Sequence, residues 1–237
     1  MRVVLVHGSV ANGEMTFASA APLAERFELV IPNRSGYPPN PPLERIDFED
    51  QALELEPLLG DGAHLVGHSY GGVISLLLAA RRPDLVRSLT VSEPPAFGIV
   101  RGNPEVERLI ADLEAFFAAG PHEPAEYLRG FLAIVGSGMA LPDLLPPGLE
   151  QGARAAMAER PPWEAEIPLD ELAAAPFPKL VVSGAHNAAF DAVCDVLEKR
   201  LGAERAVLPG AGHSLPRATG YGERLAAFFR TAEPDPS

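Results

Sequence analysis

Residues 63–80 read AHLVGHSYGGVISLLLAA, and this stretch decides the fold. It begins as a short apolar run suited to a buried strand and ends as a Leu/Ala run that favours a helix, which Pro83 would terminate. Between them stand Gly67, Ser69 and Gly71 in a G-x-S-x-G pattern. The two glycines allow strand and helix to approach closely, so the serine hydroxyl would be pushed out of a sharp turn towards the free N–H groups of the helix. The pattern predicts a nucleophilic serine rather than an ordinary glycine-rich turn.

The rest of the chain alternates between strand and helix patterns. The first apolar run, residues 3–6, is unbroken, which is typical of a strand covered on both faces and therefore of a parallel sheet. We expect an α/β fold with a mostly parallel central sheet of about six strands and helices on both faces. Besides the strand that begins at residue 63, strands are expected at residues 2–6, 27–32, 86–92, 179–183 and 204–208, and helices at about residues 15–26, 48–59, 188–201 and 220–230.

Residues 98–175 have a different sequence pattern from the rest of the chain. They contain no strand-like run, and apolar residues recur there at helical spacing between prolines. The sequence therefore predicts a helical cap at 98–175 inserted into a core formed by 1–97 and 176–232, followed by a disordered tail at 233–237. The aromatic residues Phe97, Phe116, Phe117, Tyr127, Phe131 and Trp163 are candidates for a pocket wall, although ordinary core packing would also explain each of them.

Composition narrows the classes of partner. The 237 residues carry a net charge of −13, which disfavours binding to nucleic acid or to anionic membranes, and no apolar run is long enough to span a bilayer. One cysteine precludes an internal disulfide and is compatible with a reducing, cytoplasmic location. The N-terminus enters the first expected strand at once, which leaves no room for a signal peptide. The sequence leaves the oligomeric state open.

Chemistry-bearing residues follow several of the expected strands. The carboxyl ends of parallel strands meet at one edge of a sheet, so these residues should converge although they are far apart in sequence. They are residues 7–9 (His-Gly-Ser), Arg34, Ser69, Glu93, Asn187 and His213. A nucleophile, an acid and a late histidine would therefore share one site.

These positions give the chain a resemblance to the α/β-hydrolase superfamily. The matching motifs are HG at 7–8, GHSYGG at 67–72, EPP at 93–95 and GAGH at 210–213, and they follow the order of that family over almost the whole chain. The leading antiparallel strands usual in the family are expected to be missing, because the first parallel strand begins at Arg2.

The resemblance implies roles for individual residues. Ser69 would be the nucleophile and His213 the general base. The oxyanion hole would use the backbone N–H of Tyr70 and one from the loop after residue 8, with Ser9 the first choice and Val10 the second. Among the remaining histidines, His7 and His68 are interpreted as structural, and His186 is left open.

The acid departs from the common family pattern. Counting three residues beyond Gly184 leads to Asn187, which has no carboxylate and is also well placed to cap the helix expected from residue 188. Some members of the family carry the acid at the end of the strand after the nucleophile helix, which is Glu93 here. Glu93 is therefore the predicted acid. Asp191, Asp195, Asn187 itself and a site without an acid remain alternatives.

The predicted function is a cofactor-free serine hydrolase that cleaves a carboxylic ester or lactone of a small molecule through an acyl-enzyme on Ser69. No H-E-x-x-H, cysteine–histidine cluster, P-loop or G-x-G-x-x-G pattern occurs, so neither a metal nor a nucleotide cofactor is predicted. Two alternatives remain. The same fold could catalyse C–C hydrolysis, hydroxynitrile cleavage or perhydrolysis, or the chain could be a non-catalytic binding protein on a hydrolase scaffold, which Asn187 would favour.

Overall fold

The computed structural model describes residues 1–232, and six parallel strands form the central sheet of this part of the chain. The strand order is β2-β1-β3-β4-β5-β6, so the chain builds outwards in both directions from β1 and β3. The predicted six-stranded parallel α/β architecture is confirmed, whereas the predicted tail at 233–237 lies outside the described residues. The strands are β1 (Arg2–Val6), β2 (Glu28–Val30), β3 (Ala63–His68), β4 (Val86–Ser92), β5 (Lys179–Ser183) and β6 (Glu204–Val207).

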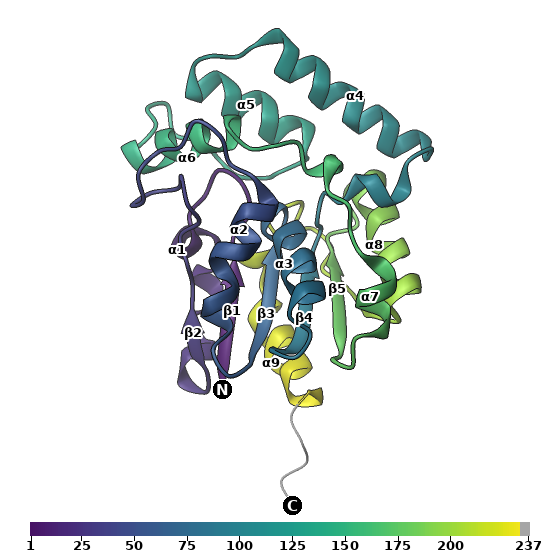
Figure 1. Cartoon of the computed structure of the whole chain (residues 1–237). Coiled ribbons are helices and arrows are strands. Elements are labelled where there is room, and N and C mark those ends of the chain that lie inside the picture. The colour runs from purple at the N-terminus through teal and green to yellow at the C-terminus, as the bar shows by residue number, and fades with distance from the viewer. Residues whose placement is uncertain (233–237) are drawn as a thin grey trace, which may run out of the picture.

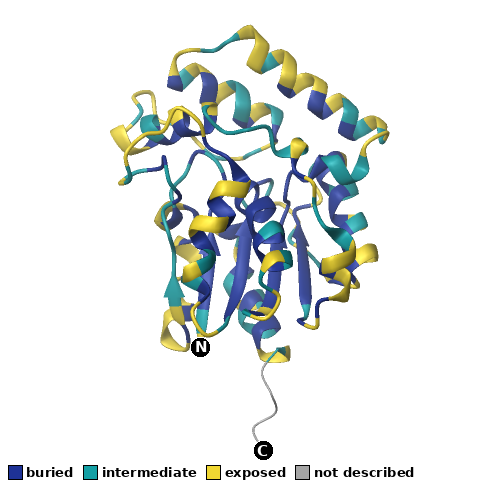
Figure 2. Cartoon of the chain, viewed as in Figure 1, coloured by how far each residue is buried: buried dark blue, intermediate teal, exposed yellow. Residues whose placement is uncertain are grey.

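Helices cover both faces of the sheet (Figure 1). Alternate residues of one strand point to opposite faces, so Val4 and Val6 belong to the same apolar layer as α2 (Phe48–Leu55), α3 (Tyr70–Arg81) and α8 (Ala188–Leu201), whereas Val3 and Leu5 belong to the layer of α9 (Tyr221–Thr231) on the other side. Both layers are apolar, and the central strand β3 is buried along its whole length (Figure 2). The helices are α1 (Gly13–Thr16), α2 (Phe48–Leu55), α3 (Tyr70–Arg81), α4 (Pro104–Ala119), α5 (Pro124–Ile134), α6 (Pro147–Met157), α7 (Leu169–Ala174), α8 (Ala188–Leu201) and α9 (Tyr221–Thr231).

Two predicted helices are shorter than expected, and each predicted range contains a proline. The helix predicted at 15–26 is instead the single turn α1 followed by a 3₁₀ helix at Ala18–Glu25 that contains Pro22. The helix predicted at 48–59 ends at Leu55 and continues as a 3₁₀ helix containing Pro57. Proline has no N–H to donate to the preceding turn, so regular α-helical hydrogen bonding stops there. The strand predicted at 27–32 is also shortened, to the three-residue edge strand β2.

Residues 98–175 contribute α4 to α7 and no strand to the sheet. Helices α4, α5 and α6 lie across the carboxyl ends of the strands, whereas α7 packs beside α3 and α8 (Figure 1). We propose that residues 98–175, called the cap segment below, form a cap over a core made of 1–97 and 176–232. Within residues 1–232, no helix is both long enough and apolar enough to cross a membrane.

Candidate active site

Ser69 lies at the junction of β3 and α3 in a backbone conformation that few side chains adopt. Its φ is 52° and its ψ is −126°. Two backbone hydrogen bonds hold it there, from Ser69 N to the Ser92 carbonyl (2.9 Å) and from Gly72 N to the Ser69 carbonyl (2.7 Å). A non-glycine residue at positive φ costs energy and persists only where its surroundings impose it. The turn places Ser69 beyond the end of the strand, where it is 9% exposed and lines two cavities.

The glycines beside Ser69 are required by space. A Cβ at Gly67 would lie 2.4 Å from the carbonyl oxygen of Gly71, and a Cβ at Gly71 would lie 2.3 Å from the carbonyl oxygen of Val6. Both distances are far below van der Waals contact, so no side chain fits at either position. The G-x-S-x-G pattern predicted this close approach of strand and helix, and the structure has it.

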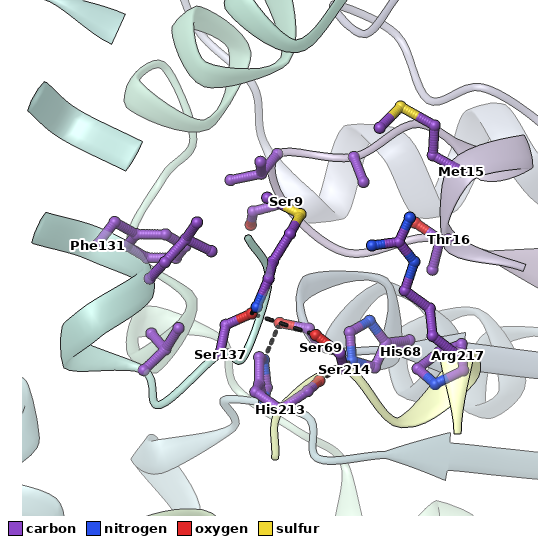
Figure 3. A pocket seen from close by; sticks show the side chains of 16 residues that line it. Ser9, Met15, Thr16, His68, Ser69, Phe131, Ser137, His213, Ser214 and Arg217 are labelled. Carbon is purple, nitrogen blue, oxygen red and sulfur yellow. Dashed lines mark hydrogen bonds between the residues drawn. The ribbon is translucent and has the colours of Figure 1, made fainter. Parts of the chain in front are cut away.

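Ser69, His213 and Glu93 form a continuous hydrogen-bonded chain. The Ser69 Oγ lies 2.9 Å from His213 Nε2, and His213 Nδ1 lies 2.8 Å from Glu93 Oε2. A carboxylate only accepts, so Nδ1 carries the proton and Nε2 is free to accept from the serine hydroxyl. Figure 3 shows the Ser69 and His213 side chains pointing towards each other at the floor of a cavity. The three residues come from the ends of β3, β4 and β6, as the topology predicts.

Glu93 is held in place from several sides. Its backbone φ is 43°, its N–H donates to the Val182 carbonyl (3.1 Å), and its Oε1 accepts from Gly184 N (2.7 Å). His186 Nδ1 lies 3.2 Å from the same oxygen. Burial alone would raise the pKa of the Glu93 carboxyl, but hydrogen bonds from His186 and His213 outweigh burial and lower this pKa to about 2. Glu93 is therefore a carboxylate across the physiological pH range.

The other candidate acids lie elsewhere. The Asn187 side chain accepts a hydrogen bond from Ala189 N (2.9 Å) and caps α8, the structural role that its sequence position suggested. Asp191 and Asp195 both pair with Arg205, at 3.2 and 3.4 Å. Of the four residues considered, Glu93 is the one that the structure places against His213.

The two candidate sources of oxyanion-hole N–H groups flank Ser69. Tyr70 is the first residue of α3, where backbone N–H groups have no acceptor within the helix. Ser9 follows β1 and lines the same two cavities as Ser69, and its neighbour Val10 has a φ of 74°. The Ser9 hydroxyl itself donates to Glu159 Oε2 (2.5 Å), so this hydroxyl is engaged away from Ser69.

The remaining histidines of the site each contact a backbone atom. His7 Nδ1 donates to the Gly8 carbonyl and its Nε2 accepts from Arg34 N, whereas His68 Nε2 donates to the His213 carbonyl (2.7 Å). Burial, helped by the charge of Arg34, lowers the pKa of His7 well below its usual value, and burial next to His213 lowers the pKa of His68 to about 3. Both rings are therefore neutral, and their hydrogen bonds fit the structural role predicted for them. His186 contacts Glu93 and also lies 3.2 Å from the Val135 carbonyl.

Glu93, His186 and His213 bring ligand-type atoms within 4.8 Å of one another. Glu93 and His213 already satisfy each other through a hydrogen bond, so their proximity is explained without an ion.

Two cavities meet at Ser69, His213 and Ser9. The first runs under the loop after β1 and past Val135, and the space open to water in it is about 60 Å³ (Figure 3). The second offers about 50 Å³ and is walled by aromatic rings. Five of the six aromatic residues proposed as a pocket wall line it, whereas Phe116 does not and packs against Gly130. The five are Phe97, Phe117, Tyr127, Phe131 and Trp163.

One buried group near Ser69 was not anticipated. Glu159, between α6 and the next 3₁₀ turn, lines the second cavity and pairs with Arg34 at 2.6 Å, although each side chain is at most 6% exposed. Arg34 was noted as a residue at the end of a strand, but Glu159 lies in a segment without periodicity. Nothing in the sequence distinguished it from the other acidic residues of the cap segment.

The chain is similar to several known proteins. Residues 3–228 match the model of a family described as "Alpha/beta hydrolase family". The pimeloyl-[acyl-carrier protein] methyl ester esterase of Chromobacterium violaceum is 36% identical over 96 residues, which are 40% of this chain and 38% of that protein. Lipase LipV of Mycobacterium tuberculosis is 33% identical over 97 residues, 39% of this chain and 37% of the lipase. The matches thus span less than two fifths of these relatives' length.

Among solved structures, NosK from Streptomyces actuosus superposes with a TM-score of 0.68 at 23% identity, and the match covers 98% of both chains. At this level of identity the likeness concerns the fold.

Proposed function

This chain belongs to the alpha/beta hydrolase family, and from that premise we propose that it is a serine esterase that cleaves a carboxylic ester or lactone through an acyl-enzyme on Ser69. The observation that carries the proposal is the hydrogen-bonded chain from Ser69 through His213 to the buried carboxylate of Glu93. The partial matches to a methyl ester esterase and a lipase support an ester as the substrate.

In the acylation step, Ser69 Oγ attacks the carbonyl carbon of the ester and its proton passes to His213 Nε2. The electron pair of the C=O π bond moves to the carbonyl oxygen, where the N–H groups of Tyr70 and Ser9 would stabilise the negative charge. The carboxylate of Glu93 stabilises the imidazolium that forms. As the C–O bond breaks, the leaving alkoxide takes the proton from Nε2, and the acyl group remains on Ser69.

Deacylation reverses these roles with water as the nucleophile. His213 Nε2 removes a proton from the water, the resulting hydroxide attacks the acyl carbon, and the proton then returns to Ser69 Oγ as the acid product leaves. Because Nδ1 donates its proton in a hydrogen bond to Glu93, the tautomer that starts both half-reactions has its lone pair on Nε2. A non-ionised acid at position 93 would not stabilise the imidazolium in this way.

The two cavities give the ester a place on each side of its carbonyl. One water needs about 10–15 Å³ of such space, so cavities of about 60 and 50 Å³ each accommodate a group of only a few heavy atoms without movement of the cap segment. The aromatic wall of the second cavity favours an apolar group there. We therefore propose that esters with short apolar acyl chains are the better substrates.

The test is hydrolysis of p-nitrophenyl acetate and butyrate by the purified chain and by Ser69→Ala. We expect turnover by the wild type and a loss of kcat on the order of 10⁴-fold or more in the variant, because removal of the nucleophile leaves only binding and the oxyanion hole. A fluorophosphonate probe should label Ser69, located by mass spectrometry. Equal turnover by both proteins would refute the proposal, and a wild type that neither turns over esters nor reacts with the probe would favour a binding protein.

A further inference from the structure

The loop after β1 is held by side chains that come from distant parts of the chain. Ser9 Oγ donates to Glu159 Oε2 at 2.5 Å, across 150 positions of sequence. The other oxygen of this carboxylate, Oε1, accepts from Arg34 Nη2 (2.6 Å) and from Tyr37 Oη (2.8 Å). Both oxygens of Glu159 are thus occupied by donors from the core. The carboxylate connects the cap segment to the residue that is the first candidate for an oxyanion-hole N–H.

Arg34, which pairs with Glu159, also contacts the same loop directly. The Arg34 guanidinium also donates to the Gly8 carbonyl and to Gln51 Oε1, each at 2.8 Å, and it lies over the ring of Tyr37 at 4.5 Å. Burial disfavours the charged guanidinium, but the charge and hydrogen bond of Glu159, together with Tyr37 and Tyr70, outweigh burial and raise the pKa of Arg34. The ion pair therefore holds the loop at two consecutive residues, because Arg34 donates to the Gly8 carbonyl and Glu159 accepts from the Ser9 hydroxyl.

The next residue of the loop is clamped by α6. Val10 is a β-branched residue with a φ of 74°, a conformation that must be imposed from outside. Its side chain is 3% exposed and packs with residues of α5 and α6. Its carbonyl oxygen rests against Gly152 of α6, where a Cβ would lie only 1.9 Å away. Residues 8, 9 and 10 are thus each held in place, two of them by the cap segment.

We infer that Glu159 is a positioning residue of the reaction, which acts through the Ser9 hydroxyl and Arg34 to hold the loop that presents the oxyanion-hole N–H. The inference rests on the proposed function. The cap segment then does more than line the cavities. The loop that presents the oxyanion-hole N–H is fixed next to Ser69 only when the segment after α6 packs against the core. Movement of Glu159 away from Ser9 would release the loop.

The first test is Ser9→Ala, which removes the hydroxyl but keeps the backbone N–H and the buried ion pair. We expect kcat on p-nitrophenyl acetate to fall about tenfold with KM and Tm close to wild type, because a donor that is misplaced by a fraction of an ångström loses transition-state binding rather than substrate binding. The matched control is Ser35→Ala, whose hydroxyl makes the same kind of contact with Glu54 (2.6 Å) outside the site. The control should keep wild-type kcat.

The second test is a double-mutant cycle with Glu159→Gln. The amide keeps an acceptor for Arg34 and Tyr37 but no longer has a carboxylate oxygen for the Ser9 hydroxyl. We expect this variant to lose kcat at least tenfold, because it also neutralises the partner of Arg34, and the double variant to be no worse than Glu159→Gln alone, because the contact with the Ser9 hydroxyl is then already lost. Glu166→Gln, an exposed carboxylate of the same segment, is the control. Additive losses, or wild-type kcat in Ser9→Ala, would overturn the inference.

A measurement that needs no turnover separates this inference from the proposed function. Amide hydrogen exchange of a peptide covering residues 7–13 should be faster in Ser9→Ala and Glu159→Gln than in wild type, with no change in the two controls. If the wild type hydrolyses esters and labels at Ser69 but exchange in this loop is unchanged, the positioning role is wrong. If exchange changes as expected and no ester is cleaved, the loop is held as described and the proposed function is wrong.

Discussion

The edge of the sheet that carries Ser69, Glu93 and His213 and the cap segment above it are built in different ways. At the sheet edge, neighbouring strands hold the reacting groups through backbone hydrogen bonds, such as Ser69 N to the Ser92 carbonyl and Glu93 N to the Val182 carbonyl. In the cap segment, three amphipathic helices bury one face and leave the other exposed (Figure 2). The contact of the cap segment with the core combines side chains, such as Glu159 paired with Arg34, with a few backbone hydrogen bonds, such as Arg160 N to the Ile46 carbonyl (2.8 Å) and His213 N to the Gly136 carbonyl (3.3 Å).

This difference indicates a division of labour. Groups that must be placed to within a fraction of an ångström follow the ends of paired strands, whereas many of the groups that line the second cavity come from the cap segment. The ion pair of Arg34 with Glu159 is one exception, because it joins the cap segment to the chemistry. Substitutions at the sheet edge should therefore change the rate, and substitutions in the cap segment should mainly change the choice of substrate.

Among variants that keep the nucleophile, the largest effect should come from Glu93→Gln at the sheet edge. The amide cannot stabilise the imidazolium of His213, and the equivalent change from aspartate to asparagine in a serine protease lowers kcat about 10⁴-fold. We expect a loss of 10³-fold or more in kcat on p-nitrophenyl acetate, measured under steady state at saturating substrate. Wild-type kcat in this variant would assign the acid to another residue.

A cap-segment change should act on selectivity. Trp163→Ala removes a ring that stacks on Phe117 with a centroid distance of 6.3 Å and lines the second cavity. We expect the ratio of kcat/KM for p-nitrophenyl hexanoate over acetate to rise about tenfold, because one or two extra methylenes then fit. Leu144→Ala, at an 86% exposed position of the cap segment, is the control. A large loss of kcat on acetate would contradict the division of labour.

Asn187→Ala tests whether Asn187 serves only as a helix cap or also takes the place of the catalytic acid. The side chain caps α8 through Ala189 N, so the substitution should lower the free energy of unfolding by about 1 kcal/mol and leave kcat unchanged. Chemical denaturation and steady-state kinetics on the same sample decide the matter. A hundredfold loss of kcat would mean that this amide takes part in the reaction.

The smallest effect is a pH-dependent one at His186. The hydrogen bond and charge of Glu93 raise the pKa of His186 against the opposing effect of burial, with smaller contributions from the Val135 carbonyl and Asp191. A raised pKa in the folded state means that the stabilisation is fully present below the unfolded value of about 6.5 and is lost as pH rises through the folded value. His186→Gln should therefore cost more unfolding free energy near pH 5 than near pH 9. A cost that grows with pH would contradict this assignment.

Much of the fold and part of the candidate site could be predicted from local signals. The elbow at Ser69 follows from residue sizes within five positions, and β4, β5 and α8 begin and end where their apolar runs and capping residues predict. The prediction was wrong at residues 15–26, where the apolar spacing indicated one helix but Pro22 and the break at Phe17 gave a short turn and a 3₁₀ helix. There, backbone chemistry overrode side-chain periodicity.

The sequence by itself determined the parallel α/β architecture and the strand ends at which Ser69, Glu93 and His213 stand, because strand and helix patterns depend on residues that are close together along the chain. Only the tertiary structure decided that Glu93 rather than Asn187 meets His213, which aromatic rings line the second cavity, and that Glu159 holds Ser9. The last contact joins residues 150 positions apart, one of them in a segment without periodicity. Such a pairing depends on how the cap segment folds back onto the core, and no local pattern encodes that geometry.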